Sequence, residues 1–361
     1  MSEFIAHRPI VSIRKHPNAD SLAILEVGAF TVVHNLKEAE QLKVGQMVTH
    51  FPTDICIHPT RAVELGVSKY LRDVRYQDDL VKSPCRIVAA RLRGTASYGF
   101  INLDTSIPDA ELDQHFGAWK YEPPELPVHI SGEKEREDHA QFPKYTKIKR
   151  IQLYPDVWTE GMPVRVTEKL HGTNVRMGVV QVDGEWRFMV GSHNVIVREF
   201  NTQTGARNKY WEMLDGDVMT LLNTICDGER PVIVYGEMLG RGIQDLDYGF
   251  EEPTLRVFDI MVDGQYLGWE LVKAYCEANG VTTVPLLYEG PFSWSTVNQL
   301  TDGGSTINNP ADFKSKFKGR EGIVITPLQE TYVNDHPLGG RLIAKSVSAD
   351  YESRRDGTEY H

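Results

Sequence analysis

The chain has 361 residues, 41% of them hydrophobic and 25% charged, which is enough for two domains that each bury a core. Its formal net charge of -11 argues against a protein that coats nucleic acid nonspecifically, although a local basic groove remains possible. No stretch approaches the roughly 20 consecutive apolar residues of a membrane span, and the N-terminus lacks the apolar run of a signal peptide. We therefore expect a soluble, cytoplasmic protein with no membrane partner, and a monomer.

Four cysteines are scattered through the chain without a C-x-x-C pair. This spacing predicts buried thiols and neither a disulfide framework nor a structural zinc site.

Residues 1–103 contain short strand-like runs separated by turn residues. The runs are IVSIRKH, LAILEVG, FTVVHN, MVTHFP, RIVAARLRG and GFINL. Pro59 and the apolar pattern around it predict one short helix within residues 53–75. Several short strands with one short helix favour an OB-like β-barrel that binds nucleic acid.

Residues 104–143 differ in composition from the segments on either side. They are first Pro-rich and then highly charged, with few side chains able to form a core. We predict that they link two domains, as a solvated tether or as a segment that binds a partner.

Residues 144–361 again contain strand-like runs, several of which alternate apolar and polar residues. Two stretches, 207–225 and 269–279, have helical spacing, and Gly280 is placed to end the second. The pattern predicts an α+β fold in which antiparallel sheets carry flanking helices.

The segment EKLHGTN, residues 168–174, follows a predicted strand and turns at Gly172. A lysine at the end of a strand, next to a glycine that lets a ligand approach the backbone, presents an amine to a phosphate. Free lysine has a pKa near 10.4, so desolvation, a neighbouring cation such as Lys345, or a metal ion must favour the neutral amine. Lys169 is the candidate nucleophile.

Four further short motifs follow Lys169 in order. They are Tyr235-Gly236-Glu237, Phe258-Asp259, Glu321-Gly322 and the Lys345 that closes RLIAK. The series resembles the motifs of the covalent ligase and capping-enzyme superfamily, whose catalytic domain has a nucleotidyltransferase (ATP-grasp-like ligase) fold. Five motifs in the same order are much more specific than any one of them.

Within that superfamily, His171 occupies a position where DNA ligases and capping enzymes usually carry Asp, and this form of the motif resembles RNA ligases. An OB-like domain ahead of the catalytic domain narrows the resemblance to RNA ligases of the Deinococcus type. The resemblance is weaker over residues 1–103 than over residues 144–348.

The resemblance implies an ATP-dependent RNA ligase with a magnesium or manganese cofactor. Lys169 would attack the α-phosphate of ATP, AMP would pass to a 5′-phosphate on RNA or DNA, and an RNA 3′-hydroxyl would displace it, as at a nick in a duplex. The residues that it implicates are Glu168 at the adenine amino group, Phe258 stacked on the base, Glu237 at the ribose, Gly172 at the nucleotide, Asn174 and Lys345 at the phosphates, and Glu321 at the metal ion.

Two positions depart from the family pattern. Many RNA ligases have two lysines separated by one residue where this chain has Ile343 and Lys345, with Arg341 nearby, so the grip on the α-phosphate is left open. His171 either orients a phosphate or hydroxyl within the nucleotide site or serves as a structural histidine.

Three arginines are candidates for contact with the nucleic acid. Arg91 and Arg93, two residues apart on one predicted strand, are expected to share a face and follow a phosphate backbone. Arg198 follows the segment GSHN, where the superfamily often places a polynucleotide-contacting loop, although a simple surface role fits equally.

Two alternatives remain. A capping-type guanylyltransferase shares the lysyl-nucleotide chemistry but uses GTP, and the His171 variant argues against it. The second alternative is a noncatalytic RNA-binding protein. Such a protein would not need Lys169, Glu237, Glu321 and Lys345, so the presence of all four argues against it.

Overall fold

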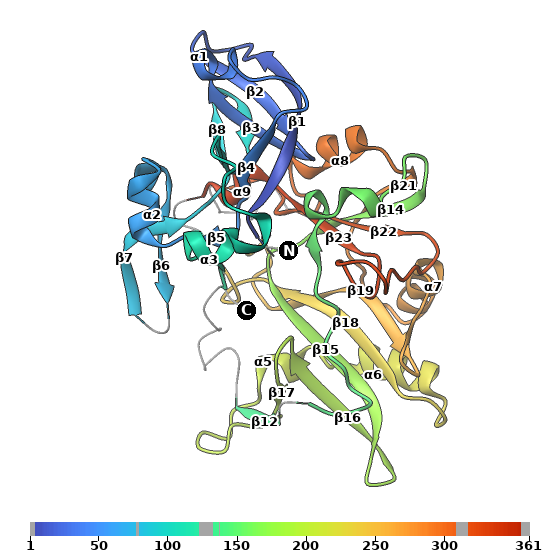
Figure 1. Cartoon of the computed structure of the whole chain (residues 1–361). Helices are drawn as coiled ribbons and strands as arrows, with labels where there is room; N and C mark the ends of the chain where they lie inside the picture. The colour runs from blue at the N-terminus through green and yellow to red at the C-terminus, as the bar shows by residue number, and fades with distance from the viewer. Residues whose placement is uncertain (1–3, 77–78, 123–132, 137, 308–316, 355–361) are drawn as a thin grey trace. The chain divides into compact units, whose positions relative to one another are not determined.

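The computed structural model describes residues 4–76, 79–122, 133–136, 138–307 and 317–354. The chain divides into two compact units, Met1–Pro123 with Ser348–Arg355, and Pro124–Val347 with Asp356–His361. Both units are sheet-rich with short helices, as the sequence predicts (Figure 1). None of the described helices is long and apolar enough to cross a membrane. All four cysteines are buried, which confirms the predicted burial of their thiols.

The first unit contains a five-stranded sheet that curls toward closure. Its order is β10 (Phe100–Asn102), β4 (Met47–Phe51), β1 (Ala6–Lys15), β2 (Leu22–Val27) and β3 (Phe30–Asn35). The backbone N–H of Tyr98, just before β10, donates to the Thr31 carbonyl of β3 at 2.9 Å. Because the first and last strands of the order meet through this segment, the sheet is barrel-like and nearly closed.

A second, four-stranded sheet and a small hairpin complete the strands of this unit. The sheet has the order β11 (Trp119–Lys120), β5 (Ile55–Cys56), β7 (Asp79–Arg86) and β6 (Arg72–Tyr76), and the hairpin joins β8 (Ala90–Leu92) to β9 (Thr95–Ser97). The helical segments are α1 (Leu36–Ala39), α2 (Pro59–Glu64), η1 (Ser68–Tyr70), η2 (Asp109–Glu111), α3 (Leu112–Phe116) and α9 (Ala349–Glu352). The predicted helix that begins at Pro59 is therefore confirmed as α2.

The first unit extends beyond the predicted boundary at residue 103. Residues 104–121 are not a linker, because Leu112 and Phe116 of α3 are buried in the same apolar cluster as Phe51. Phe51 also stacks on the Phe100 ring at 4.6 Å between centroids. The Asp113 carboxylate accepts the backbone N–H groups of Phe4 and Ile5, which ties α3 to the N-terminal strand. Residues 123–132 and 137 of the predicted linker lie outside the described residues.

The second unit is built on two sheets. The larger has the order β12 (Lys134–Arg136), β17 (Ile196–Val197), β16 (Glu185–Ser192), β15 (Thr173–Val182), β18 (Val232–Leu239), β19 (Thr254–Val262) and β20 (Gln265–Tyr266). The smaller has the order β13 (Lys149–Arg150), β23 (Ala344–Val347), β22 (Gly322–Pro327), β14 (Pro163–Lys169) and β21 (Leu286–Pro291). Among the described strands of this unit, only β13 and β23 pair in parallel, so the predicted antiparallel character is confirmed.

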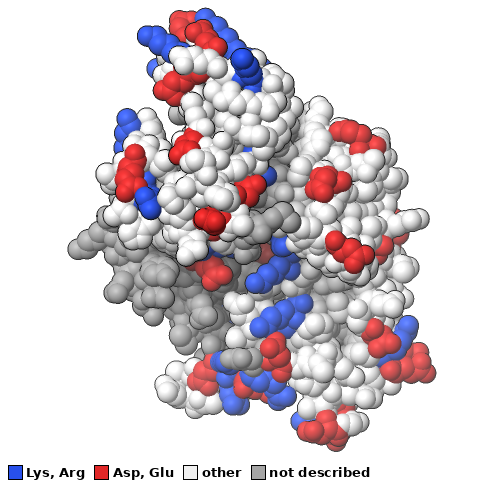
Figure 2. All heavy atoms as spheres, viewed as in Figure 1, with Lys and Arg blue, Asp and Glu red and all other residues white. Residues whose placement is uncertain are grey.

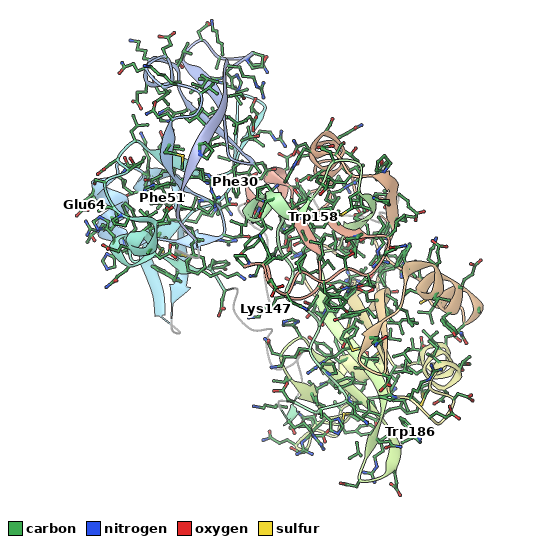
Figure 3. The ribbon with its side chains drawn as sticks, turned by 45° about the vertical axis from the view of Figure 1, so that its right-hand side comes forward. Phe30, Phe51, Glu64, Lys147, Trp158 and Trp186 are labelled. Carbon is green, nitrogen blue, oxygen red and sulfur yellow. The ribbon has the colours of Figure 1, made fainter. Side chains whose placement is uncertain are left out.

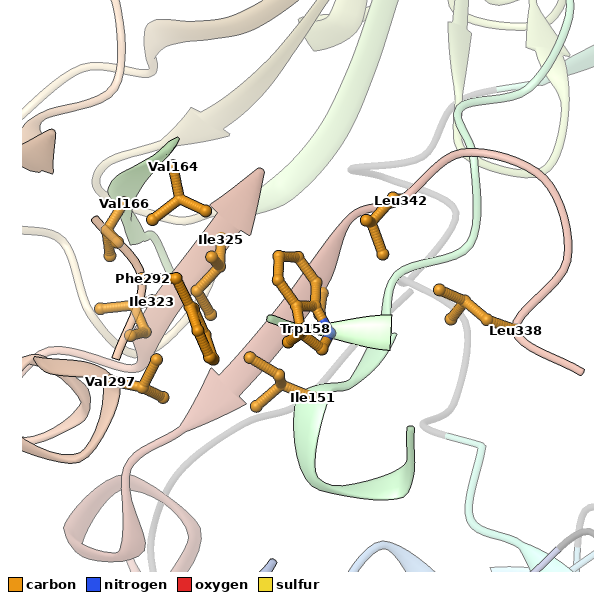
Figure 4. Packing of buried hydrophobic residues seen from close by; sticks show 11 residues of the cluster. Ile151, Trp158, Val164, Val166, Phe292, Val297, Ile323, Ile325, Leu338 and Leu342 are labelled. Carbon is orange, nitrogen blue, oxygen red and sulfur yellow. The ribbon is translucent and has the colours of Figure 1, made fainter. Parts of the chain in front are cut away.

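Helices cover these sheets, and apolar clusters fill the space beneath the helices. The helical segments are η3 (Ile151–Leu153), η4 (Pro155–Val157), α5 (Lys209–Glu212), α6 (Gly216–Cys226), α7 (Trp269–Ala278) and α8 (Trp294–Thr301). Trp158, Phe292 and Ile325 pack in the buried cluster of the smaller sheet (Figures 3 and 4). This packing fixes strand β14, and so the position of Lys169 at its end.

The structure confirms one predicted helix and divides the other. The helix predicted over 269–279 is confirmed as α7, which ends at Ala278 and is followed by Gly280 at a φ of +71°, as the glycine predicts. The stretch 207–225 is split into α5 and α6, because Asp215 adopts an extended conformation and its side chain accepts the N–H groups of Asp217 and Val218. Asp215 is therefore the N-cap of a new helix and not a continuation of α5.

Candidate functional site

Lys169 is the last residue of β14 and pairs with Gly322 of β22. Its Nζ lies 2.7 Å from Oε1 of Glu321, and both side chains are largely buried. A Cβ at Gly322 would lie 2.1 Å from the Ser346 carbonyl oxygen, so only glycine permits this approach of β22 and β23. The sequence motifs that contain Lys169 and Glu321 therefore meet through an ion pair.

Lys345 belongs to the same sheet. It pairs with Val324 in β22, two residues beyond the Gly322 that faces Lys169. Residues that are paired in antiparallel strands, or two apart along one strand, project from the same face of a sheet. The structure thus brings Lys169 and Lys345 to one face, as the motif series predicts.

Glu237 lies on β18 and pairs with Asn174 of β15. Its Oε1 accepts the Gly172 backbone N–H at 3.0 Å. Burial, reinforced by the negative charge of Glu321, raises the pKa of the Glu237 carboxyl to about 8, against the opposing effects of Lys169 and the Gly172 N–H. Asn174 is half-buried, and its buried Oδ1 has no hydrogen-bond partner among the described residues.

The raised pKa of Glu237 predicts a pH-dependent stability. The folded protein binds a proton there more tightly than the unfolded chain, so this contribution is full below about pH 4.5 and is lost as pH rises toward 8. Replacing Glu237 by Gln should remove up to about 1.4 kcal/mol per pH unit of that dependence. Thermal unfolding at pH 6 and pH 8.5 measures it, with exposed Glu229→Gln as the control. An unchanged slope in Glu237→Gln contradicts the assignment.

The turn at Leu170–Gly172 is held by a loop that the sequence analysis did not single out. The Gln244 side chain donates to the Gly172 carbonyl at 2.5 Å, and the Tyr248 hydroxyl accepts the His171 N–H at 2.7 Å. The His171 Nε2 lies 2.8 Å from Oδ1 of Asp245. His171 is thus buried against this loop. Its contacts with Tyr248 and Asp245 support the structural role among the two roles considered for it.

Sequence signals for this loop are weak. Gly240, Gly242 and Gly249 have positive φ, and so has Tyr248, a buried residue at +54°. Such a conformation is uncommon for an aromatic residue and often marks a functional site. The glycines predict only a turn, and no local pattern predicts that its side chains contact residues more than 70 positions away.

Phe258 lies at a bulge of β19. Tyr235 pairs with Asp259 and the adjacent Gly236 with Val257, which leaves Phe258 as the extra residue. A bulge redirects a side chain out of the regular strand pattern. The Phe258 ring is half-buried, with its centroid 4.8 Å from that of Tyr145, so part of it remains accessible.

Arg341 does not replace the missing lysine of the last motif. Its guanidinium binds both oxygens of Asp259, at 2.7 and 3.2 Å, and both oxygens of Glu330, at 2.5 and 2.7 Å. Ile343 is buried against the larger sheet. Arg341 is therefore committed to a buried network, and Lys345 is the cation that the last motif presents on the face shared with Lys169.

The three candidate arginines are placed differently. Arg91 is on β8 and binds the Asp350 carboxylate of α9 at 2.5 Å. Arg93 is in the turn after β8, at a φ of +50°, so the prediction that both share a strand face is wrong. The run RIVAARLRG begins at Arg86, the last residue of β7, continues through β8 and ends in the hairpin turn that Arg93 and Gly94 form. Arg198 is exposed beyond β17.

On the face shown in Figure 2, acidic side chains are interspersed among the basic ones. This distribution accords with the net charge of -11.

The described residues contain no group of three His, Cys, Asp or Glu side chains that could enclose a metal ion. Magnesium sites at phosphates commonly use one or two carboxylates, with phosphate and water oxygens as the other ligands. Glu321, whose Oε1 lies 2.7 Å from Nζ of Lys169, supplies a carboxylate of this kind.

Residues 162–347, more than half of the chain, match the sequence profile of the RNA ligase family. The chain belongs to the RNA ligase family. The matched segment contains every candidate nucleotide and metal residue from Glu168 to Lys345. A search of curated proteins found no match.

Solved structures of an RNA ligase from Naegleria gruberi share the fold of this family member. The ligase with pyrophosphate has a TM-score of 0.70 at 23% identity, covering 97% of this chain and 98% of that one. A mutant with ATP and Mn has a TM-score of 0.71 at 23% identity, covering 98% and 99%. A mutant with AMP and Mn has a TM-score of 0.71 at 22% identity, covering 98% of each chain.

Proposed function

We propose that this chain is an ATP-dependent RNA ligase that carries AMP on Lys169 and joins an RNA 3′-hydroxyl to a 5′-phosphate end. The observation that carries the proposal is the convergence of Lys169, Glu237, Glu321 and Lys345, which come from separate motifs. The Naegleria ligase is known with ATP and Mn and with AMP and Mn, which supports the same nucleotide and a divalent metal here.

In the first step the neutral Nζ of Lys169 forms a bond to the α-phosphorus of ATP as the bond to the bridging oxygen breaks. Pyrophosphate leaves, and the Lys169 nitrogen, positively charged after the attack, releases one proton to solvent. Phosphoryl transfer depends on in-line positioning and charge neutralisation. At the phosphates, Lys345 neutralises charge and the Asn174 amide helps to position the oxygens. Before the attack, Lys169 must exchange its ion-pair partner Glu321 for the nucleotide.

The other residues position the nucleotide in this proposal. Phe258 stacks on the base, Glu168 accepts the adenine amino group, Glu237 binds the ribose, and the Gly172 turn lets the nucleotide approach closely. Glu321 would hold magnesium or manganese, which would neutralise phosphate charge there.

In the second step a 5′-phosphate oxygen attacks the lysyl-AMP phosphorus and releases Lys169. In the third, the RNA 3′-hydroxyl attacks that 5′-phosphate and AMP leaves. We propose a nick in a duplex as the substrate and a monomer as the working form.

We further propose that the first unit is an OB-like barrel and that the enzyme is of the Deinococcus type. The strand order of the nearly closed sheet and the contact between Tyr98 and Thr31 support this. Arg93 and Arg198 are the arginines proposed to reach nucleic acid, and Arg91 joins them only where a phosphate displaces Asp350.

The test is covalent labelling. The protein and its Lys169→Ala variant are incubated with a divalent metal and ATP labelled at the α-phosphate, then separated under denaturing conditions. Label on the wild type alone, removed by pyrophosphate, is the expected result. Label with GTP and not ATP would indicate capping chemistry, and no label with either would indicate a noncatalytic binding protein.

A further inference from the structure

Thr306 binds one oxygen of the Glu168 carboxylate with two donors. Oε2 of Glu168 accepts the Thr306 backbone N–H at 2.8 Å and the Thr306 hydroxyl at 2.6 Å. The two residues are 138 positions apart in the sequence, and Glu168 is only 1% exposed. Two donors from one residue fix the rotation of the carboxylate, so its second oxygen has a defined direction.

The second oxygen, Oε1, is buried and has no hydrogen-bond donor among the described residues. A buried acceptor without a donor is costly, and native proteins rarely leave one unless a ligand or water completes it. Because Oε1 is shielded from solvent, a ligand must displace neighbouring atoms to reach it. The Tyr248 side chain interacts electrostatically with Glu168 as well as with Glu237 and Glu321, so the Glu168 carboxylate lies near the other acidic residues of the nucleotide site. A donor that reaches Oε1 therefore belongs to a molecule bound at that site.

An ionised carboxylate accepts hydrogen bonds and cannot donate them. With Oε2 occupied by Thr306, the oxygen left for a purine favours an amino group and disfavours a carbonyl. Adenine carries an amino donor at C6, whereas guanine and hypoxanthine carry a carbonyl acceptor there.

We propose that Thr306 is a positioning residue that sets the preference of this site for a 6-aminopurine nucleotide by orienting Glu168. The inference rests on the proposed function, since it assigns the nucleotide selectivity of that same site. Thr306 acts through Glu168 and does not itself touch the base.

The test compares Thr306→Val, which removes one of the two donors, with Thr306→Ser, which keeps it. Single-turnover formation of the protein–nucleotide adduct is followed by intact-protein mass spectrometry with ATP and with purine riboside triphosphate, which lacks the 6-amino group. In Thr306→Val the preference for ATP over the analogue should fall about tenfold, the order of one hydrogen bond to a charged group. Thr306→Ser should keep the wild-type preference, as should Thr331→Val, which removes an exposed hydroxyl elsewhere in the unit.

A second variant, Glu168→Gln, tests the orientation directly. The donors of Thr306 would hold the amide oxygen, so the amide nitrogen would face the purine and favour inosine triphosphate, which has a 6-carbonyl. Equal losses with ATP and its analogue in Thr306→Val, or an unchanged purine preference in Glu168→Gln, would overturn the proposal. A wild-type protein that forms no adduct with any of these nucleotides would instead overturn the proposed function.

Discussion

Replacing Arg341 by Met is expected to lower the free energy of unfolding of the second unit by about 3–5 kcal/mol, the range for breaking a buried ion pair. Both the Arg341 and Asp259 side chains are 1% exposed, and Tyr145 also donates to Asp259. Losing the guanidinium leaves Asp259 buried with Arg165 at 3.4 Å as its remaining charged partner in this network. Urea unfolding monitored by tryptophan fluorescence measures the change.

The matched control is Arg187→Met, because Arg187 forms an exposed ion pair with Glu185. Its effect on the free energy of unfolding should be too small to measure, because exposed ion pairs contribute little. Combining Arg341→Met with Asp259→Asn should recover part of the loss, since the unpaired buried charge is gone. A loss below 1 kcal/mol for Arg341→Met alone would show that the network does not stabilise the unit.

Replacing Gly172 by Ala is expected to slow adduct formation by at least about 100-fold, because small displacements of a reacting group have effects of this size. The added Cβ would lie 2.2 Å from the Met238 carbonyl oxygen and 3.0 Å from Cγ of Glu237. Since the carbonyl belongs to strand backbone, the turn that carries Lys169 must move instead. The adduct rate under saturating ATP measures the effect.

Gly216→Ala is the control, because a Cβ there meets nothing within 4 Å and Gly216 is the first residue of α6. Alanine in a helix should leave the rate unchanged and slightly raise stability. If Gly172→Ala forms the adduct at the wild-type rate, the close approach of the Gly172 turn to β18 does not position the nucleophile.

The parts of the fold that local patterns determine were predictable from the sequence. Strands β1 to β4 and helix α7 follow from alternation, turn residues and Gly280, and the motifs of the second unit mark Lys169, Glu237, Glu321 and Lys345. Composition was misleading for residues 104–121, where a few buried side chains such as Leu112 and Phe116 outweigh the polar sequence around them.

Contacts between residues far apart in the chain could not be predicted from the sequence. Thr306 lies 138 positions from Glu168, and Asp245 lies 74 positions from His171, so no spacing or periodicity connects either pair. Arg93 also shows the limit, because a single positive φ places it in a turn and separates it from the strand of Arg91. Such partners depend on which strands the tertiary structure brings together.

Lys169 is the residue expected to carry the nucleotide. The most direct measurement is to incubate the protein with ATP and magnesium, digest it, and locate the AMP by tandem mass spectrometry. AMP on Lys169, within the peptide containing EKLHGTN, is the predicted result. AMP on another residue, including Lys345, or a protein that carries no AMP, would contradict the account.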